Sequence, residues 1–201
     1  MKKSKKLLVA VTGSIGSGKS TFAGFLSDLG YPVLLADEIS KEILADDSEV
    51  KKEIVEEFGK ESYSDGHINK KFLADKIFTD RNKLKRINSI LHPKVRERIN
   101  KISQKYFKDY DIVFVEAALI YESKIEKNYD LVVLIVADKN LRMKRAMGAS
   151  KILQKDFIKR NRNQLNDETK MKKAHFIFTN NGSKTELKRK AILLSRLLKL
   201  G

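Results

Sequence analysis

The sequence predicts an α/β fold with five parallel strands in a doubly wound sheet. Two observations lead to this prediction: helical patterns separate the strand-like segments, and a glycine-rich stretch joins the first segment to a helix. Several of these segments are short unbroken apolar runs, which are typical of strands buried on both faces of a sheet. The five segments span residues 7–11, 32–37, 112–115, 131–136 and 175–179.

Length and composition are those of one sizeable core with room for an inserted subdomain. The chain has 201 residues, of which 41% are hydrophobic and 34% charged, as in a soluble globular protein. It has no cysteine, which excludes disulfides and thiolate metal sites. The first apolar run is shorter than the roughly 7–15 residues of a signal-peptide core. No run approaches the roughly 18 apolar residues of a membrane span, so we expect a cytoplasmic protein with no membrane partner.

The formal net charge of +16, from 42 Lys and Arg against 26 Asp and Glu, suggests an anionic partner. The basic residues are spread along the whole chain, so we expect most of them to solvate the surface. The sequence has no basic patch interleaved with aromatic residues and no familiar nucleic-acid-binding module. We therefore expect small phosphorylated substrates, no nucleic acid, and a monomer, with an oligomer left open.

The loop between the first strand and the first helix fits the pattern G-x-x-x-x-G-K-[ST], known as the phosphate loop. It reads "GSIGSGKS" from position 13 to position 20. Gly13, Gly16 and Gly18 lack Cβ, so they allow positive φ angles and let backbone N–H groups converge on an anion. The helix that begins near Gly18 adds its positive N-terminal end. The sequence therefore predicts a nucleoside triphosphate site of the P-loop NTPase type.

Side chains at the end of this loop complete the predicted site. Lys19 can reach the β- and γ-phosphates of ATP, and Ser20 can ligate Mg²⁺. Thr21 is expected to donate to the α-phosphate. The loop by itself does not specify the reaction. The ATP-binding residues predicted in the loop are Gly13, Ser14, Ile15, Gly16, Ser17, Gly18, Lys19, Ser20 and Thr21.

Acidic residues close three of the apolar strands, at the edge where open parallel sheets bind ligands. Glu116 ends the strand expected beside the phosphate loop, where an acid would hold Mg²⁺ through water. Asp37 has two interpretations: the N-cap of a helix over residues 38–44, or a group that orients and deprotonates an attacking hydroxyl. Asp138 is interpreted as the cap of the helix that follows it.

Residues 37–109 are predicted to form a helical insertion into a nucleotide-binding core made of residues 1–36 and 110–201. The insertion contains no good strand. Apolar positions such as Leu84 keep helical spacing, and Pro93 is expected to kink or restart that helix. An insertion at this place, opposite the phosphate loop, usually binds the second substrate.

Residues 139–173 are highly charged and are predicted to form a lid within the core. A solvated pair of helices would also account for the charge, but a lid would bring arginines onto the triphosphate. The arginines of this segment are Arg142, Arg145, Arg160 and Arg162. After the last strand, Ser183 and Glu186 predict a capping box at the start of the C-terminal helix.

Six stretches, which together run from about residue 7 to 182, carry a resemblance to one family. "TGSIGSGKST" is similar to its phosphate loop, and "LLADEIS" to its second-strand motif. "DGHINKKFLADKIFTD" and "LKRINSILHP" are similar to its acceptor-domain signature, and "EAALIYES" to its Pro-Leu-Leu-Phe-Glu segment. "NQLNDETKMKKAHFIFTNNG" is similar to its lid exit and last strand. The sequence resembles the dephospho-CoA kinases, and the block with "IFTD" and "LHP" is the more specific part of the match.

The resemblance implies an enzyme that uses Mg²⁺ and transfers the γ-phosphate of ATP to the ribose 3′-hydroxyl of dephospho-CoA, the last step of coenzyme A synthesis. It places Asp37 as the general base, beside Lys19 and Arg142 in the catalytic set. On the ATP side it adds Arg142, Arg145, Arg160 and Asn180, with Gln164 after the lid. On the acceptor side it implies Asp37, Arg81, His92, Pro93 and Glu122. The metal ligands are Ser20 and Glu116.

The chain departs from the family pattern at several positions. Ser14 stands where the family commonly has glycine. Residues 146–148 differ and the lid is longer, which leaves open whether Arg142 or Arg145 contacts the triphosphate. His92 has a second interpretation, as a residue at a helix break beside the following proline.

Three other functions stay open at the level of sequence. A kinase for another small molecule, such as a nucleoside monophosphate, would share everything up to Thr21, and only the acceptor helices discriminate it. A nucleic-acid-binding NTPase would be stimulated by RNA or DNA. A switch protein would bind ATP tightly without consuming it.

Overall fold

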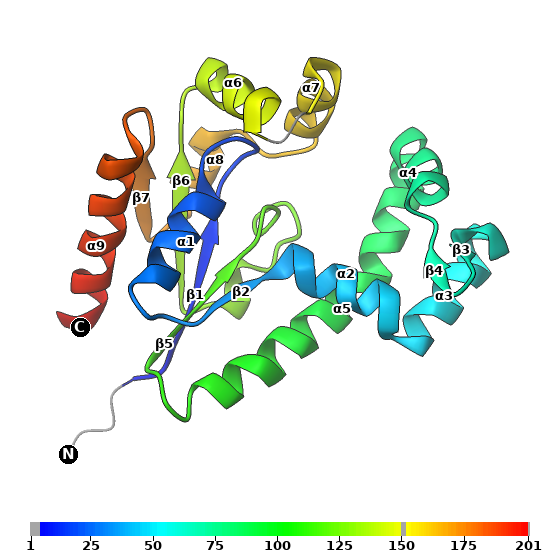
Figure 1. The fold of residues 1–201 in the computed structure, drawn as a ribbon, viewed down its shortest axis with the longest axis horizontal. Helices are drawn as coiled ribbons and strands as arrows, with labels where there is room; N and C mark the ends of the chain where they lie inside the picture. The colour runs from blue at the N-terminus through cyan, green and yellow to red at the C-terminus, as the bar shows by residue number, and fades with distance from the viewer. Residues whose placement is uncertain (1–4, 150–151, 201) are drawn as a thin grey trace. The chain divides into compact units, whose positions relative to one another are not determined.

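The structure is a computed structural model that describes residues 5–149 and 152–200, apart from the side chains at positions 78, 79, 81 and 149. The chain forms two compact units (Figure 1). The first contains Met1–Leu34 and Lys105–Gly201, and the second contains Leu35–Gln104.

The first unit is built on a five-stranded sheet in the order β2-β5-β1-β6-β7. The central strand β1 pairs in parallel with β5 and β6, and β6 pairs in parallel with β7. This confirms the predicted α/β class and its five strands. The strands are β1 (Leu7–Thr12), β2 (Val33–Leu35), β5 (Ile112–Glu116), β6 (Leu131–Val136) and β7 (Phe176–Thr179).

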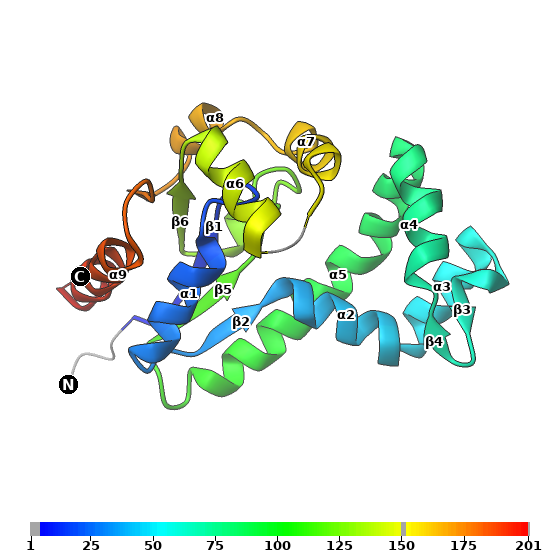
Figure 2. The ribbon, with the colours of Figure 1, turned by 45° about the horizontal axis from the view of Figure 1, so that its top comes forward.

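Two helices, α1 (Lys19–Asp28) and α9 (Lys184–Leu200), pack together on one face of this sheet (Figures 1 and 2). Alternate residues of the strands meet the apolar stripes of both helices there. Each fully buried side chain of this kind contributes about 1.5–3 kcal/mol relative to its exposed state. The core residues are Val9, Val11, Phe22, Leu26, Ile112, Phe114, Val133, Ile135, Leu187, Ala191 and Leu194.

The sequence predicted the start of α9 correctly but placed the end of β2 two residues too late. Ser183 caps α9 as predicted, because its Oγ accepts the Glu186 N–H at 3.2 Å. The second strand, predicted over residues 32–37, ends at Leu35 instead, because the next helix begins at Ala36.

Three helices follow β6 and lie beyond the carboxyl ends of β1 and β6 (Figures 1 and 2). They are α6 (Lys139–Ala149), α7 (Gln154–Arg162) and α8 (Asp167–Met171). Together they occupy the segment for which a lid is predicted. Helices α6 and α7 pack on each other, and α8 packs on β6. The connection from β5 to β6 contains a 3-10 turn, η2 (Glu126–Asn128).

The second unit is mainly helical. It contains α2 (Ala36–Asp46), α3 (Ser48–Phe58), η1 (Lys60–Ser62), α4 (Lys70–Thr79) and α5 (Arg81–Tyr106), whose last residues belong to the first unit. Its buried apolar residues lie at helical spacing on these elements. They are Ile39, Ile43, Val50, Ile54, Phe58, Leu73, Ile87, Ile90, Leu91 and Ile99.

The prediction that residues 37–109 contain no strand is wrong at one small hairpin. Strands β3 (Tyr63–Ser64) and β4 (His67–Ile68) pair in an antiparallel manner. Asp65 and Gly66 connect them with φ angles of 50° and 81°. An Asp-Gly pair with two positive φ angles is the usual two-residue turn of a hairpin. The signal was therefore present in the sequence, in a segment too short to show alternation.

Of the two outcomes predicted for Pro93, a kink or a restart of the helix, the restart is wrong and the kink stays a prediction. Helix α5 runs from Arg81 to Tyr106 with Pro93 inside it. Proline removes one backbone donor from a helix interior, but α5 buries Ile90 and Leu91 just before the proline and Ile99 after it. This packing holds both halves of the helix in register. His92 therefore lies within a helix and not at a break.

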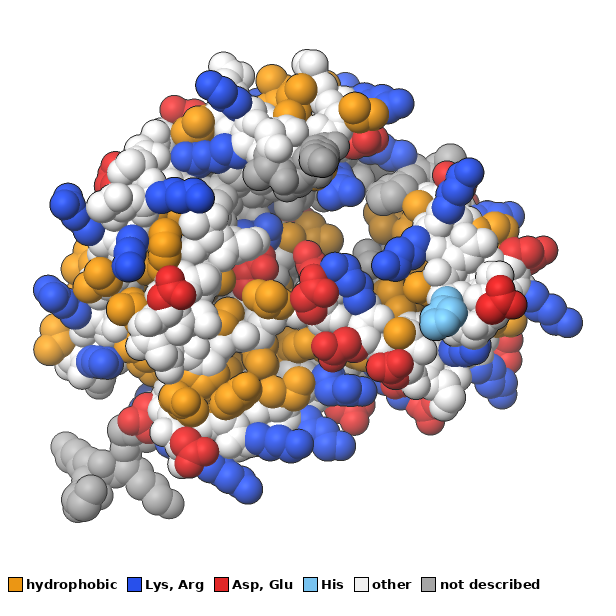
Figure 3. Space-filling view, viewed as in Figure 1, with side chains coloured by type: hydrophobic (Ala, Val, Ile, Leu, Met, Phe, Trp, Pro, Cys, Tyr) orange, Lys and Arg blue, Asp and Glu red, His pale blue; other side chains and the backbone are white. Residues whose placement is uncertain are grey.

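Charged side chains are dispersed over the face of the protein that Figure 3 shows. In Figure 3, Lys and Arg are interspersed with acidic and apolar side chains over the visible face. This distribution fits the expectation that most of them solvate the surface. Among the helices of the described ranges, none is long and apolar enough to cross a bilayer.

The burial of His92 generates a prediction about stability. Removal from water lowers the pKa of His92 below its usual 6.5. The unfolded chain therefore binds a proton at His92 at a higher pH than the folded chain does. Stability rises with pH wherever the unfolded state holds more protons, so acidification from about pH 7 to about pH 5 lowers the unfolding free energy through this residue. We expect His92→Gln to flatten that pH dependence in urea unfolding. Equal slopes in the wild type and the variant would contradict the assignment.

Candidate active site

The phosphate loop has the compact backbone that its glycines predict. Gly16 and Gly18 have φ angles of 78° and 95°, in the left-handed region that side chains other than glycine rarely adopt. Inside the loop, the Ser17 N–H donates to the Ser14 carbonyl at 3.0 Å. Helix α1 begins at Lys19, directly after Gly18. The loop thus leads straight into a helix N-terminus, which favours an anion.

Neighbouring chain segments approach the loop so closely that no side chain fits at its glycines. A Cβ on Gly16 would overlap the carbonyl oxygen of Arg142, and a Cβ on Gly18 would overlap the side-chain amide of Asn180. A Cβ on Gly13 would overlap the carbonyl oxygen of Ile135. The loop conformation is therefore held by parts of β6, α6 and the segment after β7.

Lys19 lies beside an acid on the neighbouring strand. Its Nζ is 3.4 Å from Oε1 of Glu116, the last residue of β5. The two side chains are only 15% and 9% exposed. Because β5 pairs with β1, the structure bears out the expectation that Glu116 ends the strand next to the phosphate loop. A largely buried lysine and carboxylate at a helix N-terminus suit the binding of a charged phosphate chain.

The donor atoms near the loop fit a magnesium ion that is bound mainly through phosphates. Ser20 is exposed in the first turn of α1, and Glu116 supplies a carboxylate on the adjacent strand. Mg²⁺ prefers such oxygen ligands and usually takes only one or two from the protein. The described residues hold no cluster of three or more His, Asp or Glu side chains that could bind a metal.

Arg142 on α6 contacts the phosphate loop itself. It is buried, and its Nη1 donates to the Ile15 carbonyl at 3.3 Å and to Asn161 Oδ1 at 2.9 Å. Its Nε donates to the Ala137 carbonyl at 3.1 Å, and its Nη2 lies 3.8 Å from Asp167 Oδ2. These contacts tie α6 and α7 to the loop. The predicted role of Arg142 toward the triphosphate stays a prediction.

The other ATP-side residues fall into two groups. Asn180 is buried, and its Nδ2 donates to the Ser17 carbonyl at 2.8 Å. Arg145 Nη1 donates to the Asn180 carbonyl at 2.7 Å, so both residues brace the loop. Arg160 is exposed on α7. Contact of these three residues with ATP stays a prediction.

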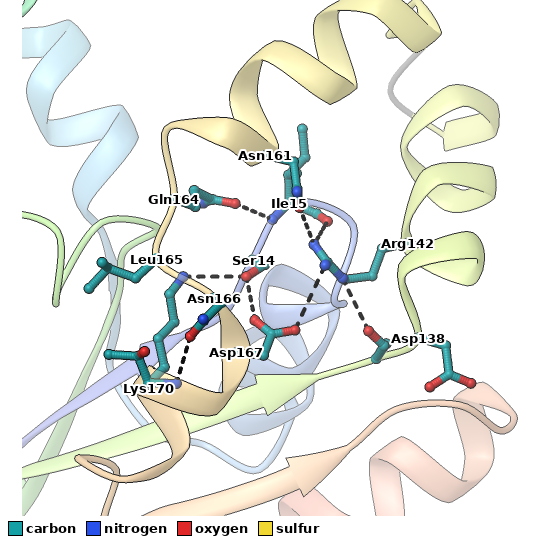
Figure 4. Close-up of polar contacts among 12 residues, drawn as sticks. Ser14, Ile15, Asp138, Arg142, Asn161, Gln164, Leu165, Asn166, Asp167 and Lys170 are labelled. Atoms are coloured by element: carbon teal, nitrogen blue, oxygen red, sulfur yellow. Dashed lines mark hydrogen bonds and ion pairs between the residues drawn. The ribbon is translucent and has the colours of Figure 1, made fainter.

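The segment after α7 holds the first half of the loop (Figure 4). Gln164 Oε1 accepts the Ile15 N–H at 2.9 Å. The Ser14 hydroxyl donates to Asp167 Oδ1 at 2.6 Å, and Lys170 Nζ lies 3.3 Å from the same hydroxyl. The segment after α7 therefore contacts two consecutive loop residues, Ser14 and Ile15.

Glu122, predicted on the acceptor side, takes part in the same cluster. Its Oε1 lies 2.8 Å from Lys170 Nζ and accepts the Leu165 N–H at 2.9 Å. The adjacent Tyr121 belongs to the core, and burial raises its pKa to about 12. The geometry of Glu122 fits an anchoring role within the first unit. Contact with the acceptor stays a prediction.

The remaining predicted acceptor residues lie in the second unit. Asp37 occupies the first turn of α2 and is exposed. The cap interpretation of Asp37 is wrong: the N-cap position belongs to Leu35, and no side chain caps this helix. His92 and Pro93 lie in α5, half-buried and exposed respectively. The side chain of Arg81 lies outside the described residues.

Sequence reasoning missed Asn161, Asp167 and Lys170. All three stand in a stretch of polar and charged residues, where nothing in the spacing separates a buried lysine from its exposed neighbours Lys172 and Lys173. Their contacts depend on the tertiary fold. The one local signal is the pattern Asn166-x-x-Thr169, since Asn166 caps α8 by accepting the Thr169 N–H at 2.8 Å.

The strand order β2-β5-β1-β6-β7, with a phosphate loop after the central strand and a lysine that faces an acid on the next strand, makes this protein a P-loop kinase. Within that class, the chain belongs to the dephospho-CoA kinase family, whose model matches residues 7–186.

Individual relatives agree with this assignment. The dephospho-CoA kinase of Bacteroides fragilis is 34% identical over 176 residues, which cover 88% of this chain and 85% of that protein. The solved structure of the dephospho-CoA kinase from Campylobacter jejuni is 28% identical with a TM-score of 0.66, and covers 98% of this chain and 99% of its own. A crystal structure from Thermus thermophilus, also 28% identical, has a TM-score of 0.83 with the same coverage.

The close approach of Arg142 to Gly16 generates a prediction about nucleotide binding. Gly16→Ala adds a methyl group that overlaps a backbone carbonyl at a positive φ, so we expect ATP affinity in calorimetry to fall by more than about tenfold through strain at this residue. Gly24→Ala in α1 is the matched control, because a Cβ there meets nothing within 4 Å. Alanine favours a helix by about 1 kcal/mol over glycine, so this variant should melt higher and bind ATP normally. Normal ATP affinity in Gly16→Ala would refute the loop geometry.

Proposed function

We propose that this protein transfers the γ-phosphate of ATP to the ribose 3′-hydroxyl of dephospho-CoA and so produces coenzyme A. The observation that carries the proposal is the phosphate loop, followed by Lys19 with Glu116 beside it, in a chain that belongs to the dephospho-CoA kinases. In phosphoryl transfer, the protein mainly positions the reactants and neutralises charge. The roles below follow from that requirement.

On the nucleotide side, the backbone N–H groups of residues 13–21 and the Lys19 ammonium would hold the triphosphate. Ser20 and Glu116 would hold Mg²⁺, which would neutralise phosphate charge when bound. A lid arginine, Arg142 or Arg145, would offset charge on the transferred group. Both arginines already lie against residues that shape the loop, which supports this role.

On the acceptor side, Asp37 would accept the proton of the attacking hydroxyl. The hydroxyl oxygen forms the new bond to the γ-phosphorus while the bond to the ADP oxygen breaks, and the proton passes to the carboxylate. Asp37 suits this role because its carboxylate is exposed and does not cap its helix. His92, Pro93 and Arg81 of the helical unit are proposed to contact the rest of the acceptor.

The proposal extends to the setting in which the enzyme works. We propose a cytoplasmic enzyme that acts as a monomer on these two small substrates. Sedimentation of the purified protein with and without ATP tests the monomer.

One assay tests the function. Purified protein receives Mg-ATP with one acceptor at a time: dephospho-CoA, a nucleoside monophosphate, or RNA. ADP release is followed together with the mass of the acceptor product. We expect rapid ADP release with dephospho-CoA only, and a product that carries its new phosphate on the 3′-oxygen. Turnover that depends on RNA or on the nucleoside monophosphate would contradict the proposal.

Asp37 is tested against its neighbour in the same helical turn. We expect Asp37→Asn to lower kcat by about 10²-fold or more, as typical for the loss of a general base, with little change in ATP affinity. Glu38→Gln is the matched control, since Glu38 is also exposed and forms an ion pair with Lys41 on the same helix. Near-normal turnover of Asp37→Asn would remove Asp37 from the mechanism.

A further inference from the structure

One lysine of the first unit is completely buried. Lys170 on α8 has 0% of its surface exposed, with its Nζ 2.8 Å from Glu122 Oε1. Removing an ammonium group from water costs much free energy, which is recovered only when an opposite charge and further hydrogen bonds surround it. An apolar residue would fill the same space without that cost. The presence of a lysine here indicates a role other than packing.

Ser14 connects this buried charge to the phosphate loop. Ser14 is itself buried, and its hydroxyl donates to Asp167 Oδ1 at 2.6 Å (Figure 4). The same hydroxyl oxygen lies 3.3 Å from Lys170 Nζ, which can donate to it. Hydrogen bonds with a charged partner are shorter and stronger than neutral ones. Two residues of α8 therefore fix the orientation of the second residue of the loop.

Lys170 also forms an ion pair with Glu122 in the segment that follows β5. Glu122, after β5, accepts from Lys170 Nζ and also from the Leu165 N–H at 2.9 Å. Lys170 thus bridges Glu122 on one side and Ser14 on the other. The bridge connects the lid exit, the segment after β5 and the phosphate loop within one compact unit.

We propose that Lys170 is a positioning residue that sets the phosphate loop for ATP through Ser14 and Glu122. The kinetic part of the test rests on the proposed function, because it needs turnover of dephospho-CoA. The main measurement is the affinity for ATP in the absence of any acceptor, which does not need turnover. Lys170 acts through other residues and does not touch the nucleotide. Its loss therefore changes the affinity for ATP and leaves recognition of dephospho-CoA intact.

The variants separate this role from folding. Lys170→Met alone leaves the Glu122 carboxylate buried without its ammonium partner, so the test uses the neutral pair Lys170→Met with Glu122→Gln. Ser14→Ala keeps the Lys170–Glu122 pair and removes only the hydroxyl that faces the lysine. Lys172→Met is the matched control, because Lys172 is exposed two residues further along the chain.

Calorimetry with Mg-ATP and steady-state kinetics are run on each variant, and thermal melting shows which variants are folded. We expect the dissociation constant and KM for ATP to rise about tenfold in the neutral pair and in Ser14→Ala. KM for dephospho-CoA should be unchanged in Ser14→Ala, which leaves Glu122 intact. The combination of all three substitutions should cost little more than either change alone, because residues of one network are not additive. Lys172→Met should match the wild type.

Three results would overturn the inference. Ser14→Ala with wild-type ATP affinity would show that the hydroxyl does not set the loop. Fully additive effects would show that Ser14 and Lys170 act independently. An equal rise in KM for both substrates in Ser14→Ala would indicate general loss of structure. Failure of the proposed function is distinct from all three: the wild type itself would then bind ATP and form no coenzyme A.

Discussion

The exclusion of side chains from three positions of the phosphate loop is the constraint on which the rest of the site depends. At Gly13, Gly16 and Gly18, the chain passes within contact distance of a carbonyl of β6, a carbonyl of α6 and the amide of Asn180. Each contact comes from a different part of the first unit. The backbone of the loop therefore packs against the sheet, helix α6 and the segment after β7.

Charged side chains lie around this backbone in two groups. Lys19 and Glu116 form the inner pair, next to the place where a triphosphate would bind. Arg142, Asp167 and Lys170 lie behind the loop and contact its carbonyl and hydroxyl oxygens. Low exposure strengthens each of these interactions relative to water. Residues of α6 and α8 thus brace the phosphate loop through its carbonyl and hydroxyl oxygens.

The sequence was sufficient to predict the sheet, the loop and the family, because these depend on local patterns. Apolar runs mark β1, β5 and β6, and the loop motif has a fixed spacing. The continuity of α5 through Pro93 was not predictable, since it depends on packing around the proline. The burial of Lys170 was not predictable either. It arises from contacts with Ser14 and Glu122, which are 156 and 48 positions away in the chain.

Hydrogen exchange of the backbone amides in residues 13–21 tests the central claim most directly, because it reports the loop backbone itself. On addition of Mg-ATP, the account predicts slower exchange at these amides, concentrated from Gly16 to Thr21, with little change along β1 and α9. Exchange in the loop that stays the same while ATP is bound elsewhere on the protein would contradict it.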